Sequence, residues 1–156
     1  MVNITSIDAK YIKLLRANDE DGCYECPSDF DAHDIEQRAR CVLADIKGKG
    51  EACKFESWMY HQDASFGLAI VFDQRSAKDK TGYVFTPGIR FSNFGSLVYL
   101  SGSEALPKSL VDFIYQSFQK HSFYPIPLHV LNQPYDGILQ DDQRLSTWWV
   151  RYFDWI

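Results

Sequence analysis

An apolar segment of strand length near the middle of the chain limits the folds that are possible. Residues 66–73 read FGLAIVFD, and as an extended strand this segment is apolar on both faces. Such a strand has to be covered on both sides, which predicts a central position in a sheet. The apolar segments that follow are separated by Pro87-Gly88 and by residues 93–95, which are typical of turns. They predict an antiparallel meander of strands at residues 83–87, 89–94 and 97–100.

Helical patterns lie on both sides of this strand region. Three helices are predicted from apolar residues at helical spacing, over residues 5–17, 32–47 and 107–121. Asp31 is the expected N-cap of the second helix. Further strands are predicted at residues 55–62, at 123–131, where two prolines suit an edge, and at 146–156, where polarity alternates. The charged stretch 74–81 is predicted to be a turn region.

These elements predict one α+β domain over residues 1–156. We expect a central, mostly antiparallel sheet of about five to six strands with three flanking helices. The 156 residues suit one domain of ordinary size.

The charge favours a protein partner over other partner classes. The chain has 21 acidic residues against 16 Lys and Arg, a net charge of −5, and 15% aromatic residues. Nucleic-acid-binding proteins usually carry a basic excess, and an anionic membrane would repel this chain. A basic protein would be attracted, and Tyr and Trp are common at protein interfaces. Neither a signal peptide nor a membrane-spanning segment is recognisable, so we expect a cytoplasmic protein with reduced cysteines.

The acidic residues gather in two places. Residues 19–36 contain eight acids and no Lys or Arg. The eight are Asp19, Glu20, Asp21, Glu25, Asp29, Asp31, Asp34 and Glu36. A smaller group follows Tyr135 and consists of Asp136, Asp141 and Asp142. Three interpretations compete for the first group: a hydrated loop, a docking surface for a basic partner, and a calcium loop. The order of residues 18–22 does not fit the EF-hand pattern, which weighs against calcium.

Cysteine and histidine residues offer the alternatives to a simple binding role. The four cysteines are Cys23, Cys26, Cys41 and Cys53. They suffice for structural zinc, although only the first two have zinc-ligand spacing, so a zinc-stabilised binding module stays open. A small hydrolase using His61 or His129 is the other alternative, although no nucleophile elbow, Walker loop or dinucleotide motif occurs. The leading expectation includes no catalytic residue, no metal and no cofactor.

Three segments of the second half resemble a known group of proteins. They are TPGIRFSNFGSLVYL (Thr86–Leu100), NQPYDGIL (Asn132–Leu139) and TWWVRYFDWI (Thr147–Ile156). They resemble immunity proteins of bacterial polymorphic-toxin and contact-dependent growth inhibition (CDI) systems. The resemblance covers roughly residues 80–156, and the first 80 residues carry no matching motif.

The resemblance implies a protein that binds and neutralises a cognate toxin C-terminal domain, often a nuclease. A nuclease holds a phosphate backbone and so has a basic cleft, which acidic and aromatic side chains can occupy. The matching motifs are expected to belong to the frame of the fold, with a buried link between Arg151 and Asp154. The residues expected to bind the partner are first Asp19, Glu20, Asp21, Glu25, Asp29 and Asp31, and second Tyr135, Asp136, Asp141 and Asp142.

Overall fold

The computed structural model describes residues 6–57, 67–139 and 141–154. The helices are α1 (Ser6–Ala17), α2 (Ala32–Gly48), α3 (Lys108–Lys120), α4 (Leu128–Leu131) and α5 (Trp148–Phe153), with a 3-10 turn η1 at Ser103–Ala105. The strands are β1 (Lys54–Ser57), β2 (Leu68–Val71), β3 (Ala77–Lys78), β4 (Val84–Phe85), β5 (Gly88–Phe91), β6 (Leu97–Ser101) and β7 (Tyr124–Pro125). No helix in these ranges is long and apolar enough to cross a membrane.

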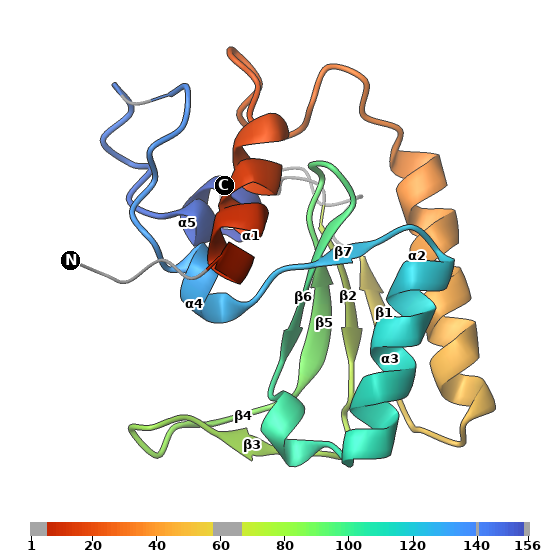
Figure 1. Ribbon diagram of the computed structural model, residues 1–156. Coiled ribbons are helices and arrows are strands. Elements are labelled where there is room, and N and C mark those ends of the chain that lie inside the picture. Colours follow the sequence, from red (N-terminus) through yellow and green to blue (C-terminus); the bar gives the residue numbers. More distant parts are fainter. Residues whose placement is uncertain (1–5, 58–66, 140, 155–156) are drawn as a thin grey trace.

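A five-stranded sheet in the order β1–β2–β5–β6–β7 organises the molecule (Figure 1). The first four strands pair antiparallel as a meander. β7 pairs parallel with β6, and the chain between these two strands passes through α3. β3 and β4 form a separate two-stranded hairpin at the lower end of the sheet in this view.

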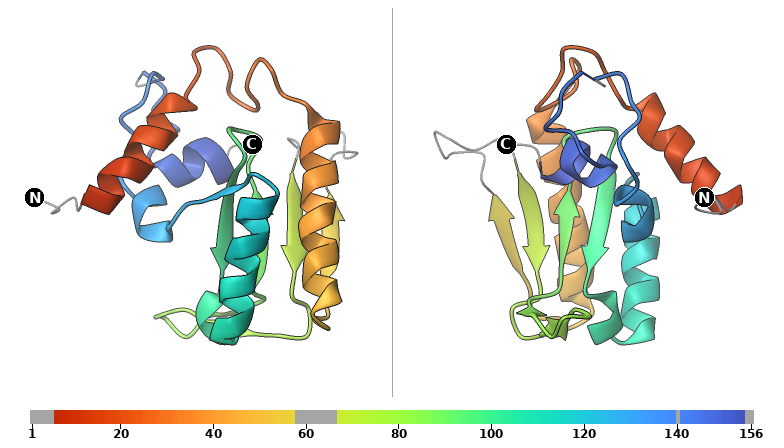
Figure 2. Two further views of the ribbon diagram at one scale, coloured as in Figure 1. Left: turned by 45° about the vertical axis from the view of Figure 1, so that its right-hand side comes forward. Right: turned by 90° about the vertical axis from the view of Figure 1, so that its left-hand side faces the viewer.

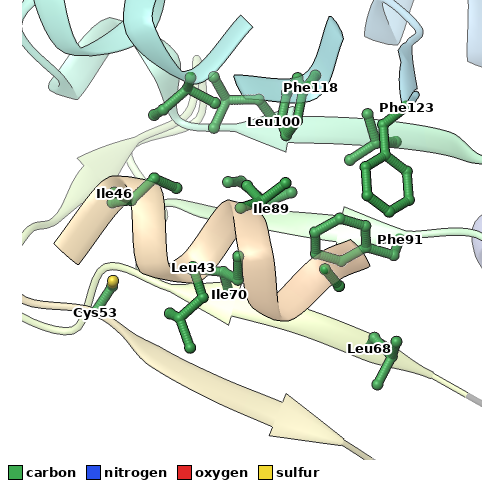
Figure 3. Close-up of a cluster of buried hydrophobic side chains, with 14 of the residues drawn as sticks. Leu43, Ile46, Cys53, Leu68, Ile70, Ile89, Phe91, Leu100, Phe118 and Phe123 are labelled. Atoms are coloured by element: carbon green, nitrogen blue, oxygen red, sulfur yellow. The ribbon is translucent and has the colours of Figure 1, made fainter. Parts of the chain in front are cut away.

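One face of the sheet is covered by α2 and α3, as both views of Figure 2 show. Alternate residues point toward these helices, because successive side chains of a strand face opposite sides. Ile70, Ile89 and Leu100 lie in register across β2, β5 and β6, and all three are buried. Leu43 and Ile46 of α2 contribute from the helix layer (Figure 3). These residues belong to the larger of the two hydrophobic clusters found among residues 6–57, 67–139 and 141–154.

A second cluster lies where α1, α4 and α5 meet the turn between β5 and β6. Its fully buried members include Leu15 of α1, Leu97 of β6 and Trp148 of α5. Phe94 reaches it from the β5–β6 turn. The two ends of the described chain are therefore packed against each other and against the sheet.

The predicted fold class is confirmed. The structure is α+β, and its three long helices match the three expected segments. The segment 66–73 contains β2, whose first three residues are buried on both faces. Asp31 is the N-cap of α2, with its side chain accepting a hydrogen bond from Asp34 N at 3.0 Å.

Four local predictions are wrong. The predicted strand 83–87 does not belong to the meander, because β4 pairs with β3 in the separate hairpin. Residues 146–156 do not form a strand, because Thr147 caps a helix and accepts from Val150 N at 3.3 Å. The stretch 74–81 is more than a turn, since it includes β3 with its buried Ala77. Within 123–131 only Tyr124 and Pro125 are strand, and α4 follows. Of the predicted strand 55–62, residues 58–62 lie outside the described part of the chain.

Candidate functional site

A fully buried ion pair joins the acidic segment to α5. The side chains of Asp19 and Arg151 are both 0% exposed, and Arg151 Nε lies 2.8 Å from Asp19 Oδ1. The same guanidinium donates to the carbonyls of Cys23 and Tyr24, at 2.8 and 3.1 Å. It also lies over the ring of Phe94, 4.4 Å from the ring centroid. Arg151 therefore holds the loop that follows α1 against the second hydrophobic cluster.

Tyr135, from the second predicted group, reaches the same carboxylate. Its hydroxyl donates to Asp19 Oδ2 at 2.5 Å and accepts from Leu139 N at 2.9 Å. Ile138 N donates to Asp19 Oδ2 at 2.8 Å. Burial and the hydrogen bond to Asp19 raise the pKa of Tyr135 to about 12. Gly137 borders this cluster so closely that a Cβ there would lie 1.9 Å from Asp19 Oδ2.

Residues of the segments Asn132–Leu139 and Thr147–Ile156 therefore contact Asp19 directly. The expected link between Arg151 and Asp154 is wrong: Asp154 is the exposed C-cap of α5, whereas Arg151 faces inward. Trp148 and Tyr152 stack with ring centroids 5.7 Å apart, and Tyr152 donates to Leu15 O at 2.6 Å. These contacts make the motif residues part of the frame that positions the acidic segment.

Three of the eight acids in residues 19–36 form ion pairs within the protein. Besides Asp19, these are Asp34, paired with Arg38, and Glu36, paired with Arg40. The last two pairs have i,i+4 spacing along α2, so neighbouring arginines offset the acids of this helix. Asp34 and Glu36 therefore form ion pairs within α2.

The other acids lie on the loop before α2. Asp21, Glu25 and Asp29 are exposed, and no ion pair within the described ranges involves them. Asp31 is exposed and uses one oxygen as the N-cap of α2. Glu20 accepts from Ser28 N at 3.1 Å; hydrogen bonds from Ser28 lower the pKa of Glu20. The loop thus presents several carboxylates to solvent.

Some of these carboxylates border a cleft of about 510 Å³ between the loop, the first turns of α2 and the β5–β6 turn. Glu20, Asp29, Asp31 and Asp34 contribute to its lining, and Arg38 is its cationic member. Asn93 of the β5–β6 turn also lines it and donates from Nδ2 to Glu25 O at 2.8 Å. We call this hollow, defined by Glu20, Asp29, Asp31, Asp34 and Arg38, the acidic cleft.

The second predicted group is mostly engaged in internal contacts. Asp136 pairs with Arg16 of α1, and Asp142 pairs with Arg144 at 2.7 Å. Asp141 is exposed. The structure therefore joins the two predicted groups through Tyr135 and Asp19, and these two side chains point into the protein. The exposed acids of the loop are the better candidates for contact with a partner.

Only one of the two histidines proposed for the hydrolase alternative lies in the described part of the chain, and it is paired with an aspartate. His129 Nε2 lies 2.8 Å from Asp8 Oδ1, but neither residue lines the acidic cleft. His61 lies outside the described residues. The pairing of His129 with Asp8 links α4 to α1.

A serine, a histidine and an aspartate do meet between α2 and α3, in the wrong order for nucleophilic catalysis. Ser117 Oγ donates to Asp45 Oδ2 at 2.9 Å, and His121 Nε2 lies 2.9 Å from the same oxygen. In a catalytic triad the serine bonds to the histidine, which removes its proton. Burial raises the pKa of Asp45, but hydrogen bonds from His121, Ser117 and Lys120 together leave it below the ordinary value.

The four cysteines lie in different environments. Cys53 is buried in the large cluster between sheet and helices, where burial raises the pKa of its thiol (Figure 3). Cys41 is exposed on α2, and Cys23 and Cys26 are partly buried in the loop. Over residues 6–57, 67–139 and 141–154, no three His, Cys, Asp or Glu side chains are grouped to hold a metal ion. Zinc binding thus has no support from the described residues.

No single motif of the sequence indicated the acidic cleft or the residues that line it. The sequence did not mark Arg38 or Asn93 as cleft residues. Arg38 belongs to neither an acidic run nor a motif, and Asn93, although inside the segment Thr86–Leu100, was expected only as part of a turn. The i,i+4 spacing of Arg38 from Asp34 was the only available signal for its position. No protein-family model, curated protein or solved structure matches this chain.

Proposed function

We propose that this protein is an immunity protein that neutralises a cognate bacterial toxin domain, with a basic nuclease as the expected class of partner. The observation that carries the proposal is the acidic cleft, bordered by a loop whose carboxylates at Asp21, Glu25 and Asp29 are exposed. The resemblance of the C-terminal motifs points to the same class. Under this proposal the protein acts in the cytoplasm, by direct binding and without catalysis.

The loop has the properties that fast, specific association requires. Exposed charges of one sign steer a partner of the opposite sign, and on-rates rise about 10- to 1,000-fold in such cases. Arg151 and the carbonyls of Cys23 and Tyr24 anchor the loop, so less of its conformational entropy has to be lost on binding. A toxin that holds a phosphate backbone presents lysines and arginines, which are complementary to these carboxylates.

Asp19 is left out of the proposed contact surface. Its carboxylate accepts from Arg151, Tyr135 and Ile138 inside the protein, so reversing its charge would test folding and not binding. The residues that test binding are exposed ones of the same loop.

The first experiment measures binding between this protein and the toxin domain encoded directly upstream of its gene. A pull-down followed by stopped-flow kinetics gives both the interaction and its association rate. If the wild-type protein captures no such domain, the proposed function is wrong.

The second experiment locates the contact. We expect the double variant Asp21→Lys/Asp29→Lys to associate about tenfold or more slowly at low salt, with a flatter dependence on ionic strength. The matched control is Glu104→Lys/Asp112→Lys, which makes the same net charge change at exposed positions near and on α3. Equal slowing by both variants would show that overall charge, and not the loop, governs association.

A further inference from the structure

A groove of about 480 Å³ lies between α1 and β7 and differs in chemistry from the acidic cleft. Tyr11, Leu14 and Tyr124 supply apolar walls, and Lys10 and Lys13 supply the charge. Tyr124 is 52% exposed, a large fraction for an aromatic residue of a strand. We call this hollow, defined by these five residues, the lysine groove.

The sequence of α1 explains why this groove is open. Ile12 and Leu15 are buried in the second hydrophobic cluster and hold the helix in place. Tyr11 and Leu14 lie at the margin of that contact and are only partly buried. Lys10 and Lys13 are three positions apart, a spacing that brings two side chains to neighbouring positions on a helix surface. The helix therefore offers an apolar strip with two cations beside it.

The edge of the sheet at this groove is unsuited to adding another strand. Tyr124 N and Ile126 N donate inward, to Ser96 O and Val98 O at 2.9 Å each. The residue between them is Pro125, which has no N–H to donate outward. Anything bound in the lysine groove is consequently recognised by side-chain contacts and charge, and not by backbone pairing.

The lysine groove and the acidic cleft are neighbours. Ala17, at the end of α1, lines both hollows. Ser96 lines the acidic cleft, and its carbonyl accepts the hydrogen bond from Tyr124 N, whose side chain lines the groove. One partner surface can therefore reach both, and it meets acids on one side of this border and lysines on the other.

We propose that the lysine groove is a second docking site for the same partner, occupied by an apolar side chain with a neighbouring carboxylate. The assignment of this occupant to the toxin domain rests on the proposed function. A uniformly basic surface docked on the acidic cleft would place its cations against Lys10 and Lys13, where like charges repel. The cognate surface therefore carries acids at this position, and the groove selects it from among other basic proteins.

The chemistry of the groove is tested first without any partner, with anilinonaphthalene sulfonate as the probe. This molecule combines an apolar aromatic body with one anionic group, the two features that the groove is proposed to recognise. We expect saturable fluorescence enhancement with the intact wild-type protein and at least about tenfold weaker binding by Lys10→Glu/Lys13→Glu. Lys80→Glu, an exposed lysine on the β3–β4 hairpin, is the control and should bind like wild type. Equal binding by all three proteins would overturn the proposal.

The identity of the occupant is tested with the upstream-encoded toxin domain. We expect Lys10→Glu/Lys13→Glu to bind it about tenfold or more weakly, whereas Lys80→Glu binds normally. Weaker probe binding together with unchanged toxin affinity would refute a shared occupant, although the acidic cleft would still bind the toxin. If the wild-type protein binds no toxin domain, the proposed function fails, and the probe experiment still decides whether the groove recognises an apolar anion.

Discussion

Replacing Asp19 by Asn should strongly destabilise the protein, although the substitution exchanges only one non-hydrogen atom. The carboxylate accepts from Arg151, Tyr135 and Ile138, and its side chain is 0% exposed. An amide has one acceptor oxygen, and its NH2 group would face donors. Arg151 would keep its two carbonyl partners, but its charge would be buried without a counter-ion.

Removing one partner of a buried ion pair costs about 3–5 kcal/mol. A domain of this kind is stable by about 5–15 kcal/mol, so the variant should still fold at low temperature. At about 2–4 °C per kcal/mol for this chain length, Tm should fall by about 6–20 °C. Urea unfolding followed by tryptophan fluorescence gives the free energy of unfolding directly, and Trp148 packs within the same cluster.

The matched control is Asp21→Asn, the same chemical change at an exposed position two residues away. It should alter the free energy of unfolding by no more than about 0.5 kcal/mol. Adding Arg151→Met to Asp19→Asn removes the unpaired charge, so the double variant should be less destabilised than the sum of the two single ones. The role assigned to this pair would be refuted if Asp19→Asn lowered the free energy of unfolding by less than about 1 kcal/mol, or by no more than the control does.

Three further predictions concern other parts of the fold. Gly137→Ala should lower the free energy of unfolding by about 1–3 kcal/mol, because its Cβ would overlap the buried cluster; Gly48→Ala, with nothing within 4 Å of the added Cβ, is the control and should not destabilise. The pKa of Asp45 is below its ordinary value of 3.8, so its stabilisation is complete above that pH and is lost as pH falls through the lower folded value. Unfolding curves of Asp45→Asn against pH should therefore lack part of the wild-type decline at acid pH, and an identical decline would contradict this. In thiol labelling of the native protein Cys41 should react first and Cys53 only after unfolding, and early labelling of Cys53 would contradict its burial.

The fold class was predictable because burial leaves periodic patterns that do not depend on distant residues. The buried members of α2 follow the helical repeat, and β2 is apolar throughout; in α2 they are Ile35, Ala39, Val42, Leu43 and Ile46. The C-terminal segment was mispredicted because it is short. Over six residues, Trp148 and Tyr152 fit both the two-residue period of a strand and the i,i+4 spacing of a helix. The cap at Thr147 distinguishes the two, and capping residues are weak evidence in a sequence read alone.

The site was predictable in charge and not in geometry. Clustering of acids is visible in the sequence, but the division between buried and exposed acids is not. Asp19 and Asp21 differ by two positions, yet the first is the counter-ion of Arg151 and the second is exposed to solvent. That difference depends on a residue 132 positions away. Charge pattern alone offers no means of choosing which acid such a residue will meet.

The distance along the chain between these two partners also sets an order of events during synthesis. Asp19 leaves the ribosome 132 residues before Arg151, which at about 5–20 residues per second is a delay of about 7–26 s. Throughout that interval the acidic loop lacks its anchor, Arg151, whereas α2 can already form. Under the proposed function, an anchored loop would make protection against a toxin begin only once α5 has been made, and a shortened chain that ends before Arg151 would be acidic, partly folded and unable to bind.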